Sequence, residues 1–372
     1  MNQSRGGSGT AIVFLVLAIG IGAVTQRYWK PAFANSKPDA SIAMPERPVV
    51  TPLDILPDDT DALLIDDVSS PVAGVQIRPE ANAINDTNEA RDAFKRAFNL
   101  TGDEKLKALK ECYATYPDSP SGIDSARTCG DIMYEIASAS TGMKQDEALN
   151  EAYEAYSVAI MGIRDRRMTA DILERLDDLS GRLAFSPTTL PRSPKGTIYN
   201  VASGDSLWSI AKKHKTTHSM IRRFNGLGEE ASIRPGQRLK ILSPETVKII
   251  VSTTEHHLTL FYDGRYIRRF NVGLGKNDST PLGVYKVSDK VDYPDWYYNG
   301  ERIPYGDKRN ILGTRWLGFD MVCAGARIGI HGTRNRDGIG GNESMGCVRL
   351  VNDDVELLYD LTPIGATVVI QR

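Results

Sequence analysis

The chain of 372 residues carries 45 Lys and Arg residues against 47 Asp and Glu residues, a formal net charge of −2. This balance excludes a strongly basic nucleic-acid-binding protein as a description of the whole chain, and the length predicts two or three domains. With 41% apolar and 25% charged residues, the chain is neither wholly disordered nor collagen-like, and its four cysteines are too few for a disulfide scaffold.

An apolar segment opens the chain. Residues 6–26 carry no charge, and as a helix they would span about 30 Å, the thickness of the bilayer hydrocarbon. Residues 27–30 are basic and aromatic (RYWK), which is typical of a membrane interface. The sequence therefore predicts an uncleaved transmembrane anchor at 1–30. A signal peptide cleaved after the small-x-small sequence at 32–34 is the alternative.

Residues 31–85 differ in composition from the rest of the chain. They hold eight of the nineteen prolines, and nine acidic against three basic side chains. Such a segment buries too little apolar surface to offset chain entropy, so we expect a disordered acidic tether. A second, shorter linker rich in proline is predicted at 186–196.

Residues 86–185 have apolar side chains at helical spacing, such as Ala148, Ala152 and Tyr156. We expect four or five antiparallel helices similar to tetratricopeptide repeats, although the sequence has no clean repeat period. This domain is interpreted as structural or as binding a protein partner. Cys112 and Cys129 are either a disulfide or two buried thiols.

Residues 197–242 predict a strand, two short helices and a second strand. Asp205 or Ser206 can cap the first helix. This β-α-α-β order, with GDSLWSIA at 204–211 and IRPGQRL at 233–239, closely resembles the LysM domain. That family binds polymers containing N-acetylglucosamine, such as peptidoglycan.

The LysM resemblance implies a glycan-binding groove between two loops. The residues that would line it are Gly204, Asp205, Ser206, Leu207, Ile233, Arg234, Pro235 and Gly236. We expect Trp208, Ile210 and Leu239 to be core residues rather than ligand contacts.

Residues 246–372 have the composition of a mostly β domain, with short alternating runs between glycines and prolines. Strands are expected at 248–251, 257–262, 265–270 and 367–370. Asp263-Gly264 between the second and third of these predicts a hairpin turn.

One region of this domain has the residue types for nucleophilic catalysis. His331-Gly332-Thr333 is followed, after a glycine-rich loop, by SMGCVRL at 344–350. A thiol attacks a carbonyl as thiolate, so Cys347 needs a base such as histidine, and flanking glycines let backbone N–H groups approach an oxyanion. Arg349 would share the strand face of Cys347 and can hold a carboxylate. By composition alone, a buried thiol and a structural histidine remain the alternative.

These motifs resemble the catalytic domain of the L,D-transpeptidases, the YkuD family. TPLGVY at 280–285 and NILGTRWLG at 310–318 match two further segments of the family pattern, so the resemblance covers 246–372. Met345 stands where many members have histidine. Cys323 is expected to be a buried thiol rather than a redox partner of Cys347.

The resemblance implies roles for individual residues. Cys347 would be the acyl-forming nucleophile and His331 its base, with the carbonyl of Gly332 orienting the imidazole. Backbone donors near Gly346 and Cys347 would stabilise the oxyanion.

The sequence as a whole predicts a multidomain α+β protein: a membrane-anchored, extracytoplasmic L,D-transpeptidase held on the cell wall by its LysM domain. It would form 3–3 cross-links between peptidoglycan stem peptides through a cysteine thioester, with Ser344 and Arg349 lining the site and binding the peptide. The expected partners are peptidoglycan, the membrane and a protein at the helical domain, without nucleic acid. No metal or cofactor is expected, because no Cys/His cluster has ligand spacing.

Two groups of alternatives remain open. One is an L,D-carboxypeptidase, or an enzyme that attaches a protein to the wall, from the same family. The other is a non-catalytic wall-binding tether, against which the intact set of His331, Cys347 and Arg349 argues.

Overall fold

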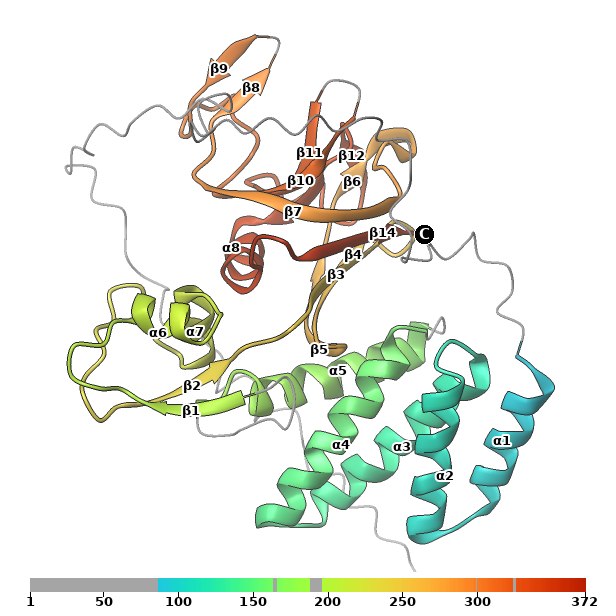
Figure 1. The fold of residues 1–372 in the computed structure, drawn as a ribbon. Coiled ribbons are helices and arrows are strands. Elements are labelled where there is room, and N and C mark those ends of the chain that lie inside the picture. Colours follow the sequence, from blue (N-terminus) through green and yellow to red (C-terminus); the bar gives the residue numbers. More distant parts are fainter. Residues whose placement is uncertain (1–85, 163–165, 188–195, 299, 324–325) are drawn as a thin grey trace, which may run out of the picture. The chain divides into compact units, whose positions relative to one another are not determined.

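The computed structural model describes residues 86–372, except for 163–165, 188–195, 299 and 324–325. The predicted anchor at 1–30 and the predicted tether at 31–85 lie outside these residues. Within the range that is described, no helix is both long and apolar enough to cross a bilayer. The described chain consists of a helical region, a small β-α-α-β module and a mostly β domain (Figure 1).

Five helices form the helical region, within the predicted range of four or five. They are α1 (Asn88–Asn99), α2 (Gly102–Thr115), α3 (Pro120–Ser138), α4 (Gly142–Ile160) and α5 (Arg166–Leu183). Helix α3 begins where the Ser119 hydroxyl accepts the Gly122 N–H at 3.0 Å and proline occupies the first turn.

The cysteines of this region are buried thiols. Cys112 and Cys129 are both free, which decides between the two predicted alternatives. Burial raises the pKa of Cys129 to about 11, so this thiol stays protonated and behaves as a small apolar side chain.

The small module follows the predicted order. Strands β1 (Gly196–Asn200) and β2 (Arg238–Leu242) pair antiparallel. Helices α6 (Leu207–Lys213) and α7 (His218–Phe224) lie between these strands in the sequence. Ser206, rather than Asp205, caps α6. Its hydroxyl accepts the Ser209 N–H at 3.0 Å, and the Ser209 hydroxyl accepts the Ser206 N–H at 2.9 Å.

The core prediction for this module is confirmed for two residues and wrong for the third. Ile210 and Leu239 are fully buried, but the side chain of Trp208 is 66% exposed. Helix α6 has only two turns, and its inward stripe is occupied by Leu207, Ile210 and Ala211. Trp208 lies about 100° around the helix from Leu207 and therefore faces outward.

The mostly β domain is built on one eight-stranded sheet. Its strands, in spatial order, are β13 (Val348–Val351), β11 (Ala326–Thr333), β10 (Arg315–Cys323), β7 (Gly283–Asp292), β14 (Thr367–Gln371), β3 (Val247–Ser252), β4 (His257–Tyr262) and β5 (Arg265–Asn271). The predicted hairpin joins β4 and β5, and both of its turn residues, Asp263 (φ 47°) and Gly264 (φ 80°), have positive φ. The side chain of Cys323 lies outside the described part.

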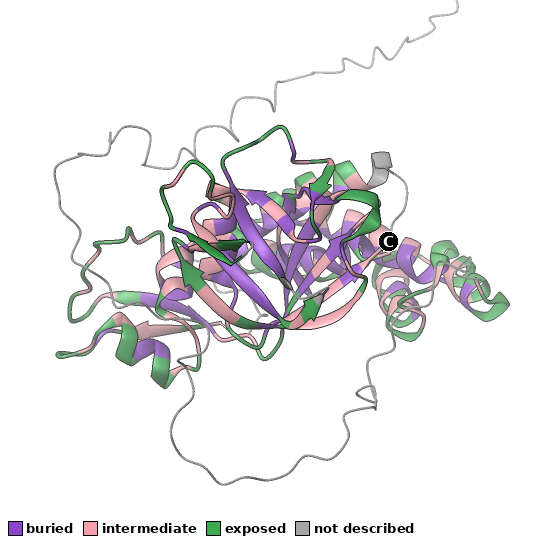
Figure 2. Ribbon diagram, turned by 90° about the horizontal axis from the view of Figure 1, so that it is seen from above, coloured by how far each residue is buried: buried purple, intermediate pink, exposed green. Residues whose placement is uncertain are grey.

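Shorter elements complete the domain. They are β6 (Leu274–Gly275) paired with β12 (Asn342–Ser344), β8 (Trp296–Tyr298) paired with β9 (Glu301–Ile303), a 3₁₀ turn at Lys276–Asp278 and helix α8 (Asn352–Leu361). Helix α8 follows β13 directly and packs against β10 and β11. Figure 2 shows that buried residues are concentrated in the central strands of the sheet.

Side chains of α4 and α5 cover β5, the edge strand of the sheet. The Ser157 hydroxyl accepts the Tyr266 N–H at 3.1 Å, and the Tyr153 hydroxyl donates to the Tyr266 carbonyl. The Ser180 hydroxyl donates to the Ile267 carbonyl at 2.8 Å. An exposed edge strand offers unpaired backbone groups to other chains. Here the helices supply partners for these groups.

Candidate active site

Cys347 stands at the start of β13, beside the backbone of β11. These strands are parallel, with Val348 opposite Ile330. The thiol is half-buried and donates toward the carbonyl oxygen of Arg327, 4.0 Å from Sγ. Its position therefore follows from the pairing of β13 with β11.

Three neighbouring strands place their polar side chains on one face of the sheet. His331 on β11 is paired with Arg349 on β13 and with Trp316 on β10. Directly paired residues project to the same face, and Cys347, two residues before Arg349, shares that face. The structure thus brings Cys347, His331 and Arg349 together.

His331 is buried and held by a backbone carbonyl. Its Nδ1 lies 2.7 Å from the carbonyl oxygen of Gly332, the contact that the sequence predicts, and the Leu312 backbone raises the imidazole pKa. The indole ring of Trp316 stacks beside the imidazole, with centroids 6.1 Å apart and 22° between the planes. The ring orientation is therefore fixed before any substrate binds.

Burial shifts the titration of both reacting groups. It lowers the pKa of His331 to about 4, with the charge of Arg349 acting in the same direction against the hydrogen bonds to Gly332 and Leu312. Burial also raises the pKa of the Cys347 thiol, although a hydrogen bond at Gly329 and the charge of Arg349 oppose this shift. At neutral pH the free site accordingly holds a thiol and a neutral imidazole.

Ser344 and Gly346 form the turn that leads into Cys347. The Ser344 hydroxyl donates to the Cys347 carbonyl at 2.7 Å and accepts the Gly346 N–H at 3.1 Å. Gly346 has φ 124° and a Cβ there would lie 3.0 Å from the Ser279 carbonyl oxygen, so only glycine fits. The buried Ser344 hydroxyl is thus engaged within the turn, and so is the Gly346 N–H.

Arg349 combines an anchored backbone with a guanidinium that has an open hydrogen-bonding position. Its N–H and carbonyl pair with Gly273 at 2.8 and 2.9 Å. Its Nε is buried and has no hydrogen-bond partner among the described residues. A buried unpaired donor of this kind is suited to a ligand oxygen.

The chain matches two family models. The L,D-transpeptidase catalytic domain matches residues 246–370, and the LysM domain matches 199–242. YqjB of Bacillus subtilis (strain 168), which is named as an L,D-transpeptidase, is 37% identical over 124 residues, covering 33% of this chain and 69% of YqjB. The chain belongs to the L,D-transpeptidase family. YkuD of Bacillus subtilis (strain 168), which carries the same kind of name, is 31% identical over 180 residues, covering 47% of this chain and 98% of YkuD.

The L,D-transpeptidase domain is thus preceded by a LysM domain, and both predicted glycan-binding loops of that domain are attached to its core. The Gly236 N–H donates to the Val201 carbonyl at 2.8 Å, and Leu207 and Ile233 pack on the same small core. The exposed members of the two loops are Gly204, Ser206, Arg234, Pro235 and Gly236.

Asp205 has a structural position in the first of these LysM loops. Its carboxylate accepts the Ala202 N–H and the Tyr199 hydroxyl, both at 2.8 Å. These hydrogen bonds lower its pKa. The side chain therefore shapes the loop from within, instead of presenting a free carboxylate to a ligand.

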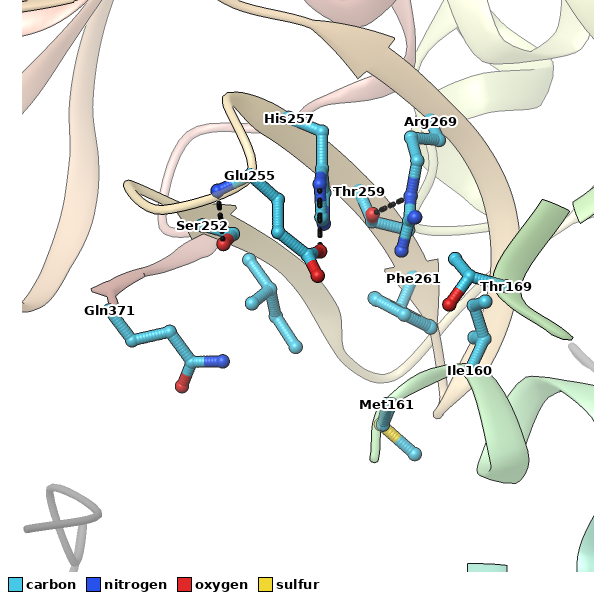
Figure 3. A pocket seen from close by; sticks show the side chains of 11 residues that line it. Ile160, Met161, Thr169, Ser252, Glu255, His257, Thr259, Phe261, Arg269 and Gln371 are labelled. Atoms are coloured by element: carbon cyan, nitrogen blue, oxygen red, sulfur yellow. Dashed lines mark hydrogen bonds and ion pairs between the residues drawn. The ribbon is translucent and has the colours of Figure 1, made fainter. Parts of the chain in front are cut away.

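A small cavity between the helical region and the L,D-transpeptidase sheet lies apart from the candidate site (Figure 3). It is about 40 Å³ in volume, far below the roughly 300–1,000 Å³ of ligand pockets. Figure 3 shows Glu255, His257 and Arg269 beside it, with Glu255 and His257 paired at 3.3 Å. Burial lowers the pKa of His257 to about 4. The cavity contains none of the predicted site residues.

Two features of the site were not predicted from the sequence. The contact of Leu312 with His331 comes from a loop that precedes β10, and the side chain of Asn352 lies behind the same loop. Leu312 belongs to the segment at 310–318 that matches the family pattern, but that match assigned it no role, and no local pattern marks Asn352. Among the described residues, no group of three or more His, Cys, Asp or Glu side chains could hold a metal ion.

Proposed function

We propose that this protein is a peptidoglycan L,D-transpeptidase that forms 3–3 cross-links through a cysteine thioester. The observation that supports this function is the placement of Cys347, His331 and Arg349 on one face of neighbouring strands, with the imidazole held by the Gly332 carbonyl. A nucleophile, a base and an orienting group are the parts that covalent acyl transfer requires.

In the first half-reaction, the Cys347 sulfur attacks the carbonyl carbon of the L,D amide in a donor tetrapeptide. The thiol proton passes to Nε2 of His331, while the Nδ1–H of the same imidazole keeps its hydrogen bond to the Gly332 carbonyl. The same proton then protonates the leaving nitrogen as the C–N bond breaks. D-alanine leaves, and the stem peptide remains as a thioester on Cys347.

In the second half-reaction, the side-chain amine of the diamino acid in a neighbouring stem attacks the thioester carbonyl. His331 takes a proton from this amine and returns it to the departing sulfur. A new amide forms, and the thiol is restored. No electrons are gained or lost over the cycle.

Oxyanion stabilisation is assigned to the backbone N–H of Cys347. The Gly346 N–H already donates to the Ser344 hydroxyl, so it is not available to the oxyanion. Arg349, with its unpaired Nε, would bind a carboxylate of the donor peptide and hold the amide over the sulfur. Ser344 would contribute through the turn and not through direct contact with the peptide.

The protonation states lead to a prediction for alkylation of Cys347 by iodoacetamide. Because burial raises the pKa of this thiol and lowers that of His331 to about 4, no preformed thiolate–imidazolium pair is expected at pH 7. The alkylation rate should be low at pH 7 and rise about tenfold per pH unit to beyond pH 9, since the thiolate is the reactive form. Peptide mapping by mass spectrometry at each pH measures this rate. A rate that is already maximal and constant between pH 5 and 8 would contradict it.

The LysM domain is proposed to hold the enzyme on the glycan strands of its substrate, which raises the local substrate concentration. The apolar segment at 6–26 is proposed to anchor the chain in the cell membrane, with the domains on the extracytoplasmic side. This location follows from the substrate, because peptidoglycan lies outside the membrane.

The product identifies the acceptor and so tests the proposed function. We expect the full chain, incubated with disaccharide-tetrapeptides, to give a cross-linked dimer and free D-alanine in equal amounts by mass spectrometry. Loss of alanine without dimer would instead identify an L,D-carboxypeptidase, because water would then resolve the thioester. Unchanged substrate would favour a non-catalytic tether.

A further inference from the structure

Asn352 lies behind the catalytic histidine, at the start of α8. It is the first residue of this helix, directly after β13. Its side-chain oxygen accepts the backbone N–H of Thr314 at 3.3 Å. Strands β10 to β13 lie between Thr314 and Asn352 in the chain, so the contact joins the helix to the loop before β10.

Two glycines make room for the Asn352 amide. A Cβ on Gly332 would lie 2.4 Å from Asn352 Oδ1, and a Cβ on Gly313 would lie at the same distance from it. The second Cβ would also meet the Gly332 backbone at 2.5 Å, and Gly313 has φ 65°. The amide oxygen therefore sits where the loop and the residue after His331 approach one another most closely.

This contact point lies beside the two backbone segments that act on the imidazole. Gly332 supplies the carbonyl at 2.7 Å from His331 Nδ1, and the backbone of Leu312 raises the imidazole pKa. Asn352 touches Gly332 on one side and fixes Thr314, two residues after Leu312, on the other. A shift of the loop would move one imidazole partner relative to the other.

We propose that Asn352 is a positioning residue that acts through His331, a role that rests on the proposed transpeptidase function. Its amide oxygen fixes the loop at 312–314 against Gly332, so that the Gly332 carbonyl holds the imidazole toward Cys347. Misplacing a catalytic group by about 1 Å costs on the order of 10²-fold in rate. Asn352 does not touch the reacting atoms.

The charged groups around His331 determine how its titration would respond to a change at this position. The charge that acts on the imidazole is that of Arg349 on β13, which lowers its pKa; the acids of the first turn of α8, Asp353 and Asp354, do not act on it. Asp353 is exposed, 87% for its side chain, and pairs only loosely with Arg336 at 3.8 Å. A new charge at position 352 would be closer to the imidazole than these acids, because residue 352 contacts Gly332.

Two variants of the full chain test the proposal in single-turnover acylation, measured as D-alanine release from a disaccharide-tetrapeptide. Asn352→Ala removes the acceptor, and we expect the maximal acylation rate to fall about 10–100-fold with little change in the substrate concentration for half-maximal rate. Asn352→Asp keeps an acceptor of the same shape and is expected to restore most of this rate. Its carboxylate should also move the acidic limb of the pH–rate profile to higher pH, because it favours the imidazolium form.

Asp353→Asn is the matched control, since it changes a neighbouring side chain that faces solvent; it should leave both rate and profile unchanged. Thermal unfolding of each variant shows whether it is folded at the assay temperature, so that the rates compare folded enzymes. The proposal is overturned if Asn352→Ala acylates like wild type, or if Asn352→Asp is as slow as Asn352→Ala with an unmoved acidic limb. Inactivity of the wild-type chain would count against the proposed function instead.

Discussion

Replacing Cys347 with alanine is expected to abolish acyl transfer, with a fall in rate of at least about 10³-fold. Without the sulfur no thioester can form, and the remaining groups of the site provide only binding and electrostatic stabilisation. The expected results are loss of the cross-linked dimer, loss of D-alanine release and loss of the acyl-enzyme mass adduct. Intact-protein mass spectrometry during turnover measures the adduct directly.

The same substitution at the two free cysteines that the structure describes in the helical region supplies the control. Cys112 and Cys129 are buried thiols in the helical region, and the L,D-transpeptidase domain does not include them. Cys112→Ala and Cys129→Ala should therefore keep the acyl-enzyme adduct and the cross-linked product. Turnover by Cys347→Ala at the wild-type rate would remove Cys347 as the nucleophile and with it the proposed mechanism.

The parts of the fold that depend on local pattern were predictable. The turn at Asp263-Gly264 and the apolar runs on either side fixed the β4–β5 hairpin, because two residues with positive φ are what a tight hairpin turn requires. The shared face of Cys347 and Arg349 followed from the two-residue period of a strand. The partnership with His331 depends on the pairing of β11 and β13, which the sequence analysis did not predict.

Side-chain direction in a short helix was not predictable in the same way. Trp208 was expected in the LysM core because it is large and apolar, but α6 has an inward stripe already filled by smaller side chains. Asp205 was expected to line the glycan groove; its carboxylate is hydrogen-bonded within its own loop, a detail that the sequence did not predict. In a module this small, burial depends on the exact helix phase and not on hydrophobicity alone.

Contacts between distant segments could not be predicted from the sequence, for a different reason. Asn352 and Leu312 affect His331 through the backbone of a loop, and nothing in their local sequence indicates this. The helical region was expected to be structural or to bind a protein partner. The side chains of this region that hydrogen-bond to the backbone of β5 follow no repeat pattern, so the sequence did not point to them. Such contacts are specified only once the strands are assembled.

The packing of α4 and α5 against β5 leads to the second prediction with a large expected effect, which concerns the free energy of unfolding. Tyr153 is fully buried, and its hydroxyl donates to the Tyr266 carbonyl on the edge strand. Tyr266 in turn donates its own hydroxyl to Asp177 of α5 at 2.8 Å, and Arg265 pairs with Glu154 of α4. The helices and the sheet edge thus contribute to one apolar core and are also joined by polar contacts. We therefore expect them to unfold as one unit.

Tyr153→Ala should lower the free energy of unfolding by about 3–5 kcal/mol, the range for removing a buried aromatic side chain. Tyr153→Phe should cost about 1–3 kcal/mol, because it leaves the Tyr266 carbonyl buried without its partner. Urea unfolding followed by tryptophan fluorescence is the decisive measurement. All described tryptophans, Trp208, Trp296 and Trp316, lie outside the helical region, so their signal reports on the remainder of the protein.

Phe98→Ala is the matched control within the helical region, since this ring is 55% exposed and its loss should change stability by no more than about 0.5 kcal/mol. A common midpoint for fluorescence and for helical circular dichroism, shifted equally by Tyr153→Ala, is the expected outcome. If Tyr153→Ala lowers only the helical midpoint and leaves the fluorescence midpoint in place, the helices unfold independently of the sheet. The edge strand would then be stable without its cover, and the helical region would be free to serve another role.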